Sequence, residues 1–361
     1  MISALDRCLE RAVEGARLDV DEALALLEGA DLPSLAAAAH AARCRVTDER
    51  VATYVVDRNI NYTNVCVSGC RFCAFFREPG DATGYVLTLD ELDRKIEATL
   101  ALGGTQILMQ GGLHPALRLE FFEAMLRHIK ATYPIHVHSF SPPEIVHFAR
   151  LNGLGVETVL RRLQEAGLDS LPGGGAEILV ERVRESVSPH KCTAQQWLDV
   201  MRTAHGIGMP TTATMMFGHV ETLGERVEHL ARVRELQDET ARLSSPQAGG
   251  FTAFIPWTYQ PANTALGGRT VGGHDYLRTL AVSRLFLDNV RNVQASWVTQ
   301  GVKIASVALG FGANDLGGTM IEENVVAAAG VSHSMTIEEI RALIEDAGFE
   351  PKQRTTLYEL V

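Results

Sequence analysis

Three cysteines lie close together at Cys66, Cys70 and Cys73, with C-x3-C-x2-C spacing in the segment 59–77, N-I-N-Y-T-N-V-C-V-S-G-C-R-F-C-A-F-F-R. Three thiolates on one short loop can bind three irons of a cubane iron–sulfur cluster, and the fourth iron then stays open to an outside ligand. A zinc site, which normally takes four ligands, and thiols that are close by chance are the alternatives. An iron–sulfur electron carrier, which is not an enzyme, would also cluster its cysteines, but it requires a full set of four ligands. The spacing therefore favours a cluster with one open iron.

Glycine-rich and polar stretches elsewhere are further candidates for a site. Gln110-Gly111-Gly112 follows a predicted strand, where glycine lets the backbone approach a ligand; a tight turn is the simpler interpretation. Three glycines precede Glu177, whose carboxylate suits ribose hydroxyls, with a solvated turn as the alternative. Arg182 and Arg184 follow, and either could bind a carboxylate with two hydrogen bonds, although at least one is expected on a solvated helix face.

Histidines and aromatic residues at other strand ends complete the candidates. His136 and His138 are two apart on a predicted strand and therefore point to the same face, so both are candidates for catalysis. His219 is a third candidate, and the preceding Gly218 would let a flat ring lie against the main chain. Residues expected to contact a substrate are Ser139, Trp257, Gln260 and Asn263.

Composition limits the kinds of partner. The 361 residues carry a formal charge of −11 without a long basic run, which argues against nucleic acid or an anionic membrane as partner. The first residues have neither the basic flank nor the apolar core of a signal peptide, and no stretch is apolar for long enough to span a membrane. Cys8, Cys44 and Cys192 are scattered, which fits a reducing compartment better than a disulfide framework. We therefore expect a cytoplasmic protein.

An alternation of apolar runs and capped helices predicts an α/β fold with parallel strands. The predicted strands are 54–56, 59–65, 106–109, 135–140, 211–217, 251–257, 293–298 and 306–311. Capping boxes predict helix starts after Asp19, Thr88, Thr193, Thr222 and Thr336. We expect a (β/α)8 TIM-type barrel at 48–330, an N-terminal helical cap at 1–47 and a short helix–strand extension at 331–361 that packs on the barrel; a doubly wound open sheet is the alternative. In a barrel, sites gather at the carboxyl ends of the strands, which is where the cysteines fall.

Phe72, directly before the last cysteine, makes this loop resemble that of the radical S-adenosylmethionine (radical SAM) superfamily. Within the superfamily the chain resembles the dehypoxanthine futalosine cyclases of menaquinone biosynthesis. The stretches that carry this resemblance are D-R-N-I-N-Y-T-N-V-C, C-R-F-C-A-F-F-R, H-S-F-S-P-P-E-I, L-P-G-G-G-A-E-I-L, T-M-M-F-G-H-V-E-T, F-I-P-W-T-Y-Q-P and G-G-T-M-I-E-E-N-V-V-A-A-A-G. The segment 241–250 departs from the family in being longer. Aminofutalosine synthases and deazaflavin-cofactor synthases share the cysteine loop and remain alternatives.

The resemblance implies a [4Fe-4S] cluster and S-adenosylmethionine (SAM) as cofactors. Phe72 would lie against the adenine, the glycine motif after Gln110 would meet the methionine amino group, and Glu177, Arg182 and Gly218 would complete the cofactor site. The implied reaction begins with a 5′-deoxyadenosyl radical that takes hydrogen from C4′ of the ribose in dehypoxanthine futalosine. The resulting carbon radical adds to the benzoate ring of the substrate, and loss of one electron and one proton finishes the product. An external one-electron reductant such as flavodoxin or ferredoxin would reduce the cluster.

Overall fold

The computed structural model of this chain describes residues 3–243, 249–331 and 333–361. Part of the segment 241–250, at 244–248, therefore lies outside the described residues. Within these described ranges the strands form three parallel sheets, in the orders β8-β1-β9, β2-β3-β4 and β5-β6-β7. Their bounds are β1 Val51–Val55, β2 Asp57–Asn61, β3 Gln106–Gln110, β4 His136–Ser139, β5 Pro210–Phe217, β6 Gly250–Thr258, β7 Asn292–Val293, β8 Asp315–Gly318 and β9 Glu350–Gln353.

Isolated bridges join these sheets. The segment 170–171 links β4 to β5, because Ser170 pairs with His138 and Leu171 pairs with Thr211. Gln294, just after β7, pairs with Asp315 at the start of β8. All of these pairings are parallel. Neighbouring strands therefore present their carboxyl ends at the same side of the molecule.

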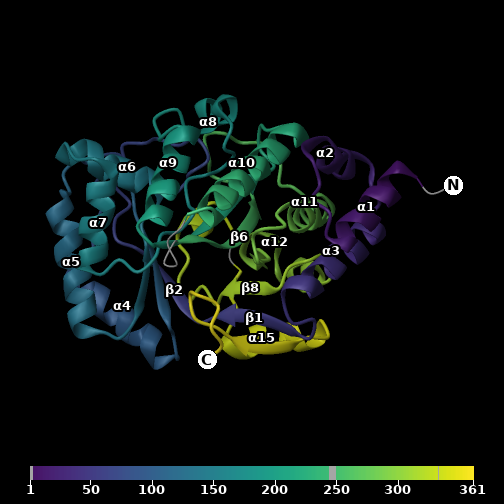
Figure 1. Ribbon diagram of the computed structural model, residues 1–361. Coiled ribbons are helices and arrows are strands. Elements are labelled where there is room, and N and C mark those ends of the chain that lie inside the picture. The colour runs from purple at the N-terminus through teal and green to yellow at the C-terminus, as the bar shows by residue number, and fades with distance from the viewer. Residues whose placement is uncertain (1–2, 244–248, 332) are drawn as a thin grey trace.

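Helices follow the strands and cover them on the outside (Figure 1). The helices between β2 and the C-terminal segment are α4 Leu89–Ala101, α5 Leu119–Thr132, α6 Pro142–Asn152, α7 Val156–Ala166, α8 Glu181–Val187, α9 Ala194–Gly206, α10 Leu223–Ala241, α11 Gly273–Phe286, α12 Trp297–Gln300, α13 Val302–Leu309 and α14 Val325–Ala328. The capping boxes at Thr88, Thr193 and Thr222 are present, with each threonine hydroxyl accepting from the backbone N–H three residues later. The predicted helix starts are confirmed there.

The two ends of the chain add helices and a strand. At the N-terminus α1 Ala4–Glu14, α2 Val20–Gly29 and α3 Leu32–Val46 form a layer beside α11, seen at the right of Figure 1. At the C-terminus α15 Ile337–Asp346 is followed by β9, which pairs in parallel with β1. The capping boxes at Asp19 and Thr336 are also present. The C-terminal residues thus extend a sheet formed by the earlier part of the chain.

The prediction of a strand at 306–311 is wrong. Residues 306–309 belong to α13, and the strand lies further on, at β8. A short apolar run fits a buried helix as well as a buried strand, and alanine at 305 and 308 favours the helix. The strand predicted at 293–298 is similarly shortened, since β7 ends at Val293 and Trp297 begins α12.

Candidate active site

A central cavity of about 270 Å³ lies among the strands. Trp257, Trp297 and Ile255 contribute apolar surface to its lining, while Gln110 and His138 contribute polar groups. Its floor includes side chains from the C-terminal segment, namely Arg354, Thr356 and Tyr358. A mainly apolar cavity with a few polar groups is typical of a small-molecule site.

The cysteine loop follows β2 and is closed at its base by backbone pairing. Cys66 N–H donates to the Arg77 carbonyl at 2.9 Å, and Arg77 N–H donates to the Asn64 carbonyl at 2.8 Å. The Arg77 guanidinium donates to the carbonyls of residues 74, 75 and 76, which shapes the loop from inside. Arg71 N–H donates to the carbonyl of Val187 at the end of α8, at 2.9 Å. Leu266 N–H donates to the Arg71 carbonyl at 2.8 Å, so the loop is anchored to two distant parts of the chain.

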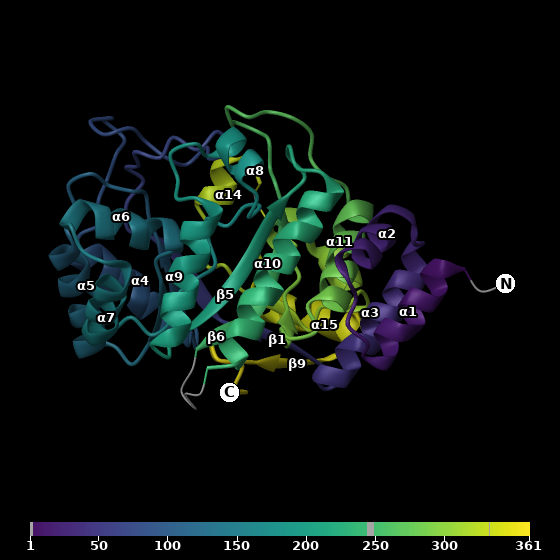
Figure 2. The same cartoon turned by 45° about the horizontal axis from the view of Figure 1, so that its top comes forward.

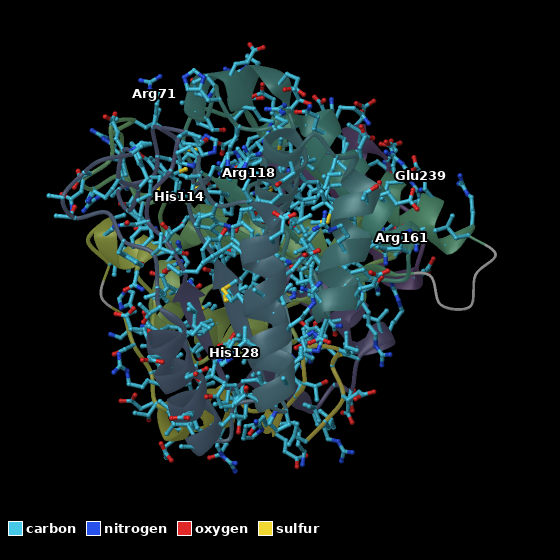
Figure 3. All side chains as sticks on the ribbon, turned by 90° about the vertical axis from the view of Figure 1, so that its left-hand side faces the viewer. Arg71, His114, Arg118, His128, Arg161 and Glu239 are labelled. Carbon is cyan, nitrogen blue, oxygen red and sulfur yellow. The ribbon has the colours of Figure 1, made fainter. Side chains whose placement is uncertain are left out.

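This loop lies at the end of the molecule where the strands finish. Figure 2 shows α8 and α14 at that end, at the top of the view. In Figure 3 Arg71 lies at the top, and α5 descends from Arg118 to His128. Because α5 runs back after β3, the carboxyl end of β3 at Gln110 lies at the upper end, near the cysteines.

The three thiols fit a cluster. Cys70 is buried and Cys66 and Cys73 are half-buried, and burial raises the pKa of the Cys70 thiol to about 11. Ser68 N–H approaches the Cys66 sulfur at 3.4 Å and its hydroxyl lies 3.2 Å from the Cys70 sulfur, so the loop offers donors to ligating thiolates. Within the described residues no three His, Cys, Asp or Glu side chains converge on a single-ion site. Each cysteine of a cubane cluster binds a different iron, so a cluster does not need such convergence.

The glycines after Gln110 are required by packing against the cysteine loop. A Cβ on Gly111 would lie 2.5 Å from the Tyr62 ring, and one on Gly112 would lie 2.3 Å from the Val65 carbonyl oxygen. Their N–H groups are already used, since Gly111 donates to Glu144 at 3.1 Å and Gly112 donates to the Thr63 carbonyl at 3.0 Å. The motif therefore holds the end of β3 directly against the loop.

Glu177 is buried beside the cysteine loop with a positive φ of 42°. Lys191 Nζ donates to Oε1 at 2.8 Å, and the Arg184 guanidinium lies 3.5 Å from Oε2, which has no hydrogen-bond partner among the described residues. Lys191 also lies 5.0 Å over the Phe72 ring. Burial lowers the pKa of Lys191, but the nearby Cys70 and Glu177 raise it further, so the ammonium stays charged. No signal in the sequence around Lys191 pointed to this role.

Several residues that the sequence suggested for cofactor binding or catalysis make other contacts in the structure. Arg182 is exposed and pairs with Glu225 at 2.5 Å, so it is Arg184, donating to the Gly175 and Ala176 carbonyls, that borders the glycine-rich turn. Gly218, at φ 92°, donates its N–H to Glu221, and His219 is fully used, since Nδ1 accepts from Val220 N–H and Nε2 contacts the Met216 carbonyl. Both ring nitrogens of His219 are therefore in contact with backbone groups.

Of the residues predicted to contact the substrate, some line the cavity and others do not. Trp257 lines the cavity, as does His138. Ser139 points to the opposite face of β4 and is completely buried, and Gln260 donates to the carbonyls of Thr258 and Thr299. Asn263 is exposed and donates to the Ala328 carbonyl at 3.0 Å, which links its loop to α14. Of these four, Trp257 is the residue that borders the cavity.

Comparison with known proteins agrees with this geometry. Residues 60–233 match the model of the radical SAM superfamily, and residues 248–361 match the CofH/MqnC C-terminal region. The chain is 47% identical over 360 residues, covering 99% of it and 95% of the relative, to a cyclic dehypoxanthine futalosine synthase of Halalkalibacterium halodurans. It is 43% identical over 368 residues, covering 99% of it and 97% of the relative, to a 5-amino-6-(D-ribitylamino)uracil–L-tyrosine 4-hydroxyphenyl transferase of Methanopyrus kandleri. A crystal structure of the hydrogenase maturase HydG from Carboxydothermus hydrogenoformans has a similar fold, with a TM-score of 0.77 at 17% identity over 98% of this chain and 80% of that one.

The chain is therefore a radical SAM enzyme, of the class that uses a [4Fe-4S] cluster and SAM. Within that superfamily it belongs to the family of the cyclic dehypoxanthine futalosine synthases. The spacing of Cys66, Cys70 and Cys73 and the buried carboxylate of Glu177 beside them fit both cofactors.

Proposed function

We propose that this enzyme converts dehypoxanthine futalosine to its cyclic product in menaquinone biosynthesis. The observation that carries the proposal is the 47% identity, over essentially the whole of both chains, to a protein named for that activity. The central cavity supports it, because apolar and aromatic walls with a few polar groups suit a substrate that joins a ribose to a benzoate ring.

We propose that Cys66, Cys70 and Cys73 bind the cluster and that SAM lies between it and the cavity. When bound, the two cofactors supply the 5′-deoxyadenosyl radical that takes hydrogen from C4′ of the substrate. The Oε2 of Glu177, which has no hydrogen-bond partner among the described residues, is available to accept from ribose hydroxyls, and adenine would lie on the face of the Phe72 ring that Lys191 does not cover. The amino group of methionine is a hydrogen-bond donor, so in the segment 110–112 it would be the backbone carbonyls that accept from it, while the N–H groups of Gly111 and Gly112 donate within the protein.

We propose further that the strands close into a (β/α)8 barrel around the cavity. Hydrogen bonds from the residues just after β8 to β1 and β2 support closure, since Thr319 N–H donates to the Val55 carbonyl at 3.0 Å and Ile321 N–H donates to the Asp57 carbonyl at 3.3 Å. The barrel would span 48–330, with the N-terminal cap at 1–47 and the extension at 331–361. A closed barrel suits radical chemistry because it excludes water and other reactants from the reacting carbons.

The cellular setting belongs to the same proposal. We place the enzyme in the cytoplasm, with an external one-electron donor of the flavodoxin or ferredoxin type reducing the cluster. Within the described residues no helix is both long enough and apolar enough to cross a bilayer.

A second candidate function follows from the 43% identity to a 4-hydroxyphenyl transferase. That relative acts, by its name, on L-tyrosine and 5-amino-6-(D-ribitylamino)uracil. Because both families match over nearly the whole chain, identity alone separates the candidates by a few percentage points. The two reactions use different substrates, so assays with each pair decide between them.

The decisive experiment uses anaerobically reconstituted enzyme, SAM, a reductant and dehypoxanthine futalosine carrying deuterium at C4′. We expect 5′-deoxyadenosine bearing one deuterium, together with a product two hydrogens lighter than the unlabelled substrate. A parallel reaction with L-tyrosine and the ribitylaminouracil should give no 4-hydroxyphenyl adduct. Deuterium that stays in the substrate, or an adenosyl group joined to the product, would refute the cyclase assignment and leave the sister enzymes.

A further inference from the structure

Two histidines and one serine form a continuous chain of short contacts at the central cavity. His138 Nδ1 lies 2.6 Å from Ser170 Oγ, and His136 Nε2 lies 2.7 Å from the same oxygen. His136 and His138 occupy alternate positions of β4 and so share a face, and Ser170 pairs with His138 from the neighbouring strand segment. The parallel pairing of the strands therefore brings one hydroxyl between two imidazoles.

The contacts run from the cavity toward one end of the strands. Asn59, Leu108 and His138 are paired in register and all line the cavity. His136 belongs to the preceding layer, paired with Gln106, and it is only half-buried. The chain of contacts thus begins at a cavity wall and ends at a residue with access to solvent.

Hydrogen-bond chemistry makes the three side chains one unit. The serine hydroxyl has a single proton, so for both contacts to be hydrogen bonds one histidine must donate to Oγ while the other accepts from it. When His138 donates through Nδ1, its Nε2 is an unprotonated base facing the cavity, and Ser170 donates to His136. A proton received at His138 Nε2 can then pass along the unit as Nδ1 gives its own proton to Oγ and Oγ gives its own to His136.

The surrounding charges favour transfer of the proton from His138 toward His136. Burial, followed by the electrostatic effects of His136 and of the Arg354 guanidinium, lowers the pKa of His138 to about 3, so an added proton does not stay there. Burial also lowers the pKa of His136, but the Asp169 carboxylate opposes this shift and Lys130 reinforces it. Asp169 bonds Lys130 at 2.8 Å and Val137 N–H at 2.7 Å, and the lysine is thus paired.

We propose that His138, Ser170 and His136 form the relay that removes the proton lost in the last step of the cyclisation. The inference rests on the proposed function. After the C4′ radical has added to the benzoate ring, a ring C–H bond breaks, its proton goes to His138 Nε2, and the ring becomes aromatic again. The remaining electron passes to a one-electron oxidant of the iron–sulfur class, for which the oxidised cluster of the enzyme would serve.

Two carboxylates also border the cavity, and they are the competing bases. Glu323 accepts three backbone N–H groups at the start of α14, which leaves little capacity for another proton donor. Asp57 accepts from Gln106 at 2.9 Å, and its other oxygen has no partner among the described residues. Among the described residues, the hydrogen bonds of these two carboxylates come from amide and backbone N–H groups, whereas His138 contacts the Ser170 hydroxyl, which can pass a proton on.

The test compares holoenzyme variants on the C4′-deuterated substrate. Ser170→Ala should still release deuterated 5′-deoxyadenosine at a rate within a few-fold of wild type, while the ratio of cyclised product to 5′-deoxyadenosine falls about tenfold or more. Ser170→Thr restores the hydroxyl and should recover most of that ratio. His138→Gln should give the same uncoupling as Ser170→Ala.

A matched control is Thr240→Val, which removes a hydroxyl 2.7 Å from the buried His205 in the outer helix layer. It should leave the ratio unchanged even though it also breaks a buried histidine–hydroxyl contact. As a readout independent of turnover, spectra of protein with ¹⁵N-labelled histidine should show one fixed tautomer of His138 in wild type and a mixture of tautomers in Ser170→Ala.

A wild-type ratio in both Ser170→Ala and His138→Gln would overturn the relay, as would uncoupling by Asp57→Asn alone. A His138 tautomer that does not respond to Ser170→Ala would overturn it as well. Failure of the proposed function looks different, because wild-type enzyme would then give neither deuterated 5′-deoxyadenosine nor cyclised product.

Discussion

Glu144 gives the sharpest prediction of pH-dependent stability. Its carboxylate is buried at the start of α6 and receives Tyr62 OH at 2.7 Å, Gly111 N–H at 3.1 Å and the hydroxyl of Ser141. Burial raises the pKa of this carboxyl group from 4.5 to about 7, although the three donors oppose the shift. The Glu144 side chain therefore links the glycine motif after β3 to α6. Its burial favours the protonated carboxyl group.

The sign and size of the pH effect on stability follow from the difference between the pKa of Glu144 in the folded chain and in the unfolded chain. Because the folded chain holds this proton more tightly than the unfolded chain does, the stabilising contribution is complete below about pH 4 and is lost as pH rises through 7. At about 1.4 kcal/mol per pKa unit, a shift from 4.5 to about 7 amounts to roughly 3 kcal/mol. Glu144→Gln keeps the shape and cannot titrate, so its stability should lack this component.

The assay is guanidinium unfolding followed by circular dichroism, for wild type and Glu144→Gln, at several values between pH 5 and pH 8. The wild type should lose on the order of 2–3 kcal/mol relative to the variant over this range. Parallel pH profiles would show that Glu144 titrates in the folded chain as it does in the unfolded one, and the argument from its burial would fail.

Three further predictions concern the cofactor site. Cys70→Ala should lose the cluster, measured as bound iron and sulfide, while Cys192→Ala should keep it; a cluster lost in both would reveal a fourth ligand. Gly112→Ala places a Cβ 2.3 Å from the Val65 carbonyl oxygen. It should lower the stability of the fold by about 1–3 kcal/mol, seen as a lower melting temperature, and should also lower the amount of cluster bound. Lys191→Met leaves the Glu177 carboxylate without its closest partner and should cost on the order of 3 kcal/mol in stability and weaken SAM binding by calorimetry. Arg182→Ala, which changes a surface residue, should alter neither the stability nor the binding of SAM. Equal losses in Lys191→Met and Arg182→Ala would contradict the placement of Lys191 and Glu177 in the cofactor site.

Local sequence was sufficient for the helix starts at the capping boxes and for recognising the cysteine loop. Capping boxes fix helix starts through contacts three residues apart, and those at Thr88, Thr193, Thr222 and Thr336 are present as predicted. The three cysteines proposed as cluster ligands could be singled out because they lie a few residues apart on one short loop. The strand at 306–311 was mistaken because a short apolar run has the same pattern in a buried helix as in a buried strand.

Only the tertiary structure decided which side chains meet at the cavity. Arg354 reaches its floor and bonds Asp315 because β9 pairs with β1 across about three hundred residues, a contact that no local pattern encodes. Spacing showed that His136 and His138 share a face, but the parallel register of β4 with the segment at Ser170 was needed to bring a hydroxyl between them. The sequence by itself determined the types of group and their local geometry, since these depend on near neighbours. Their partners depend on strand order and register, which the packing of the whole chain sets.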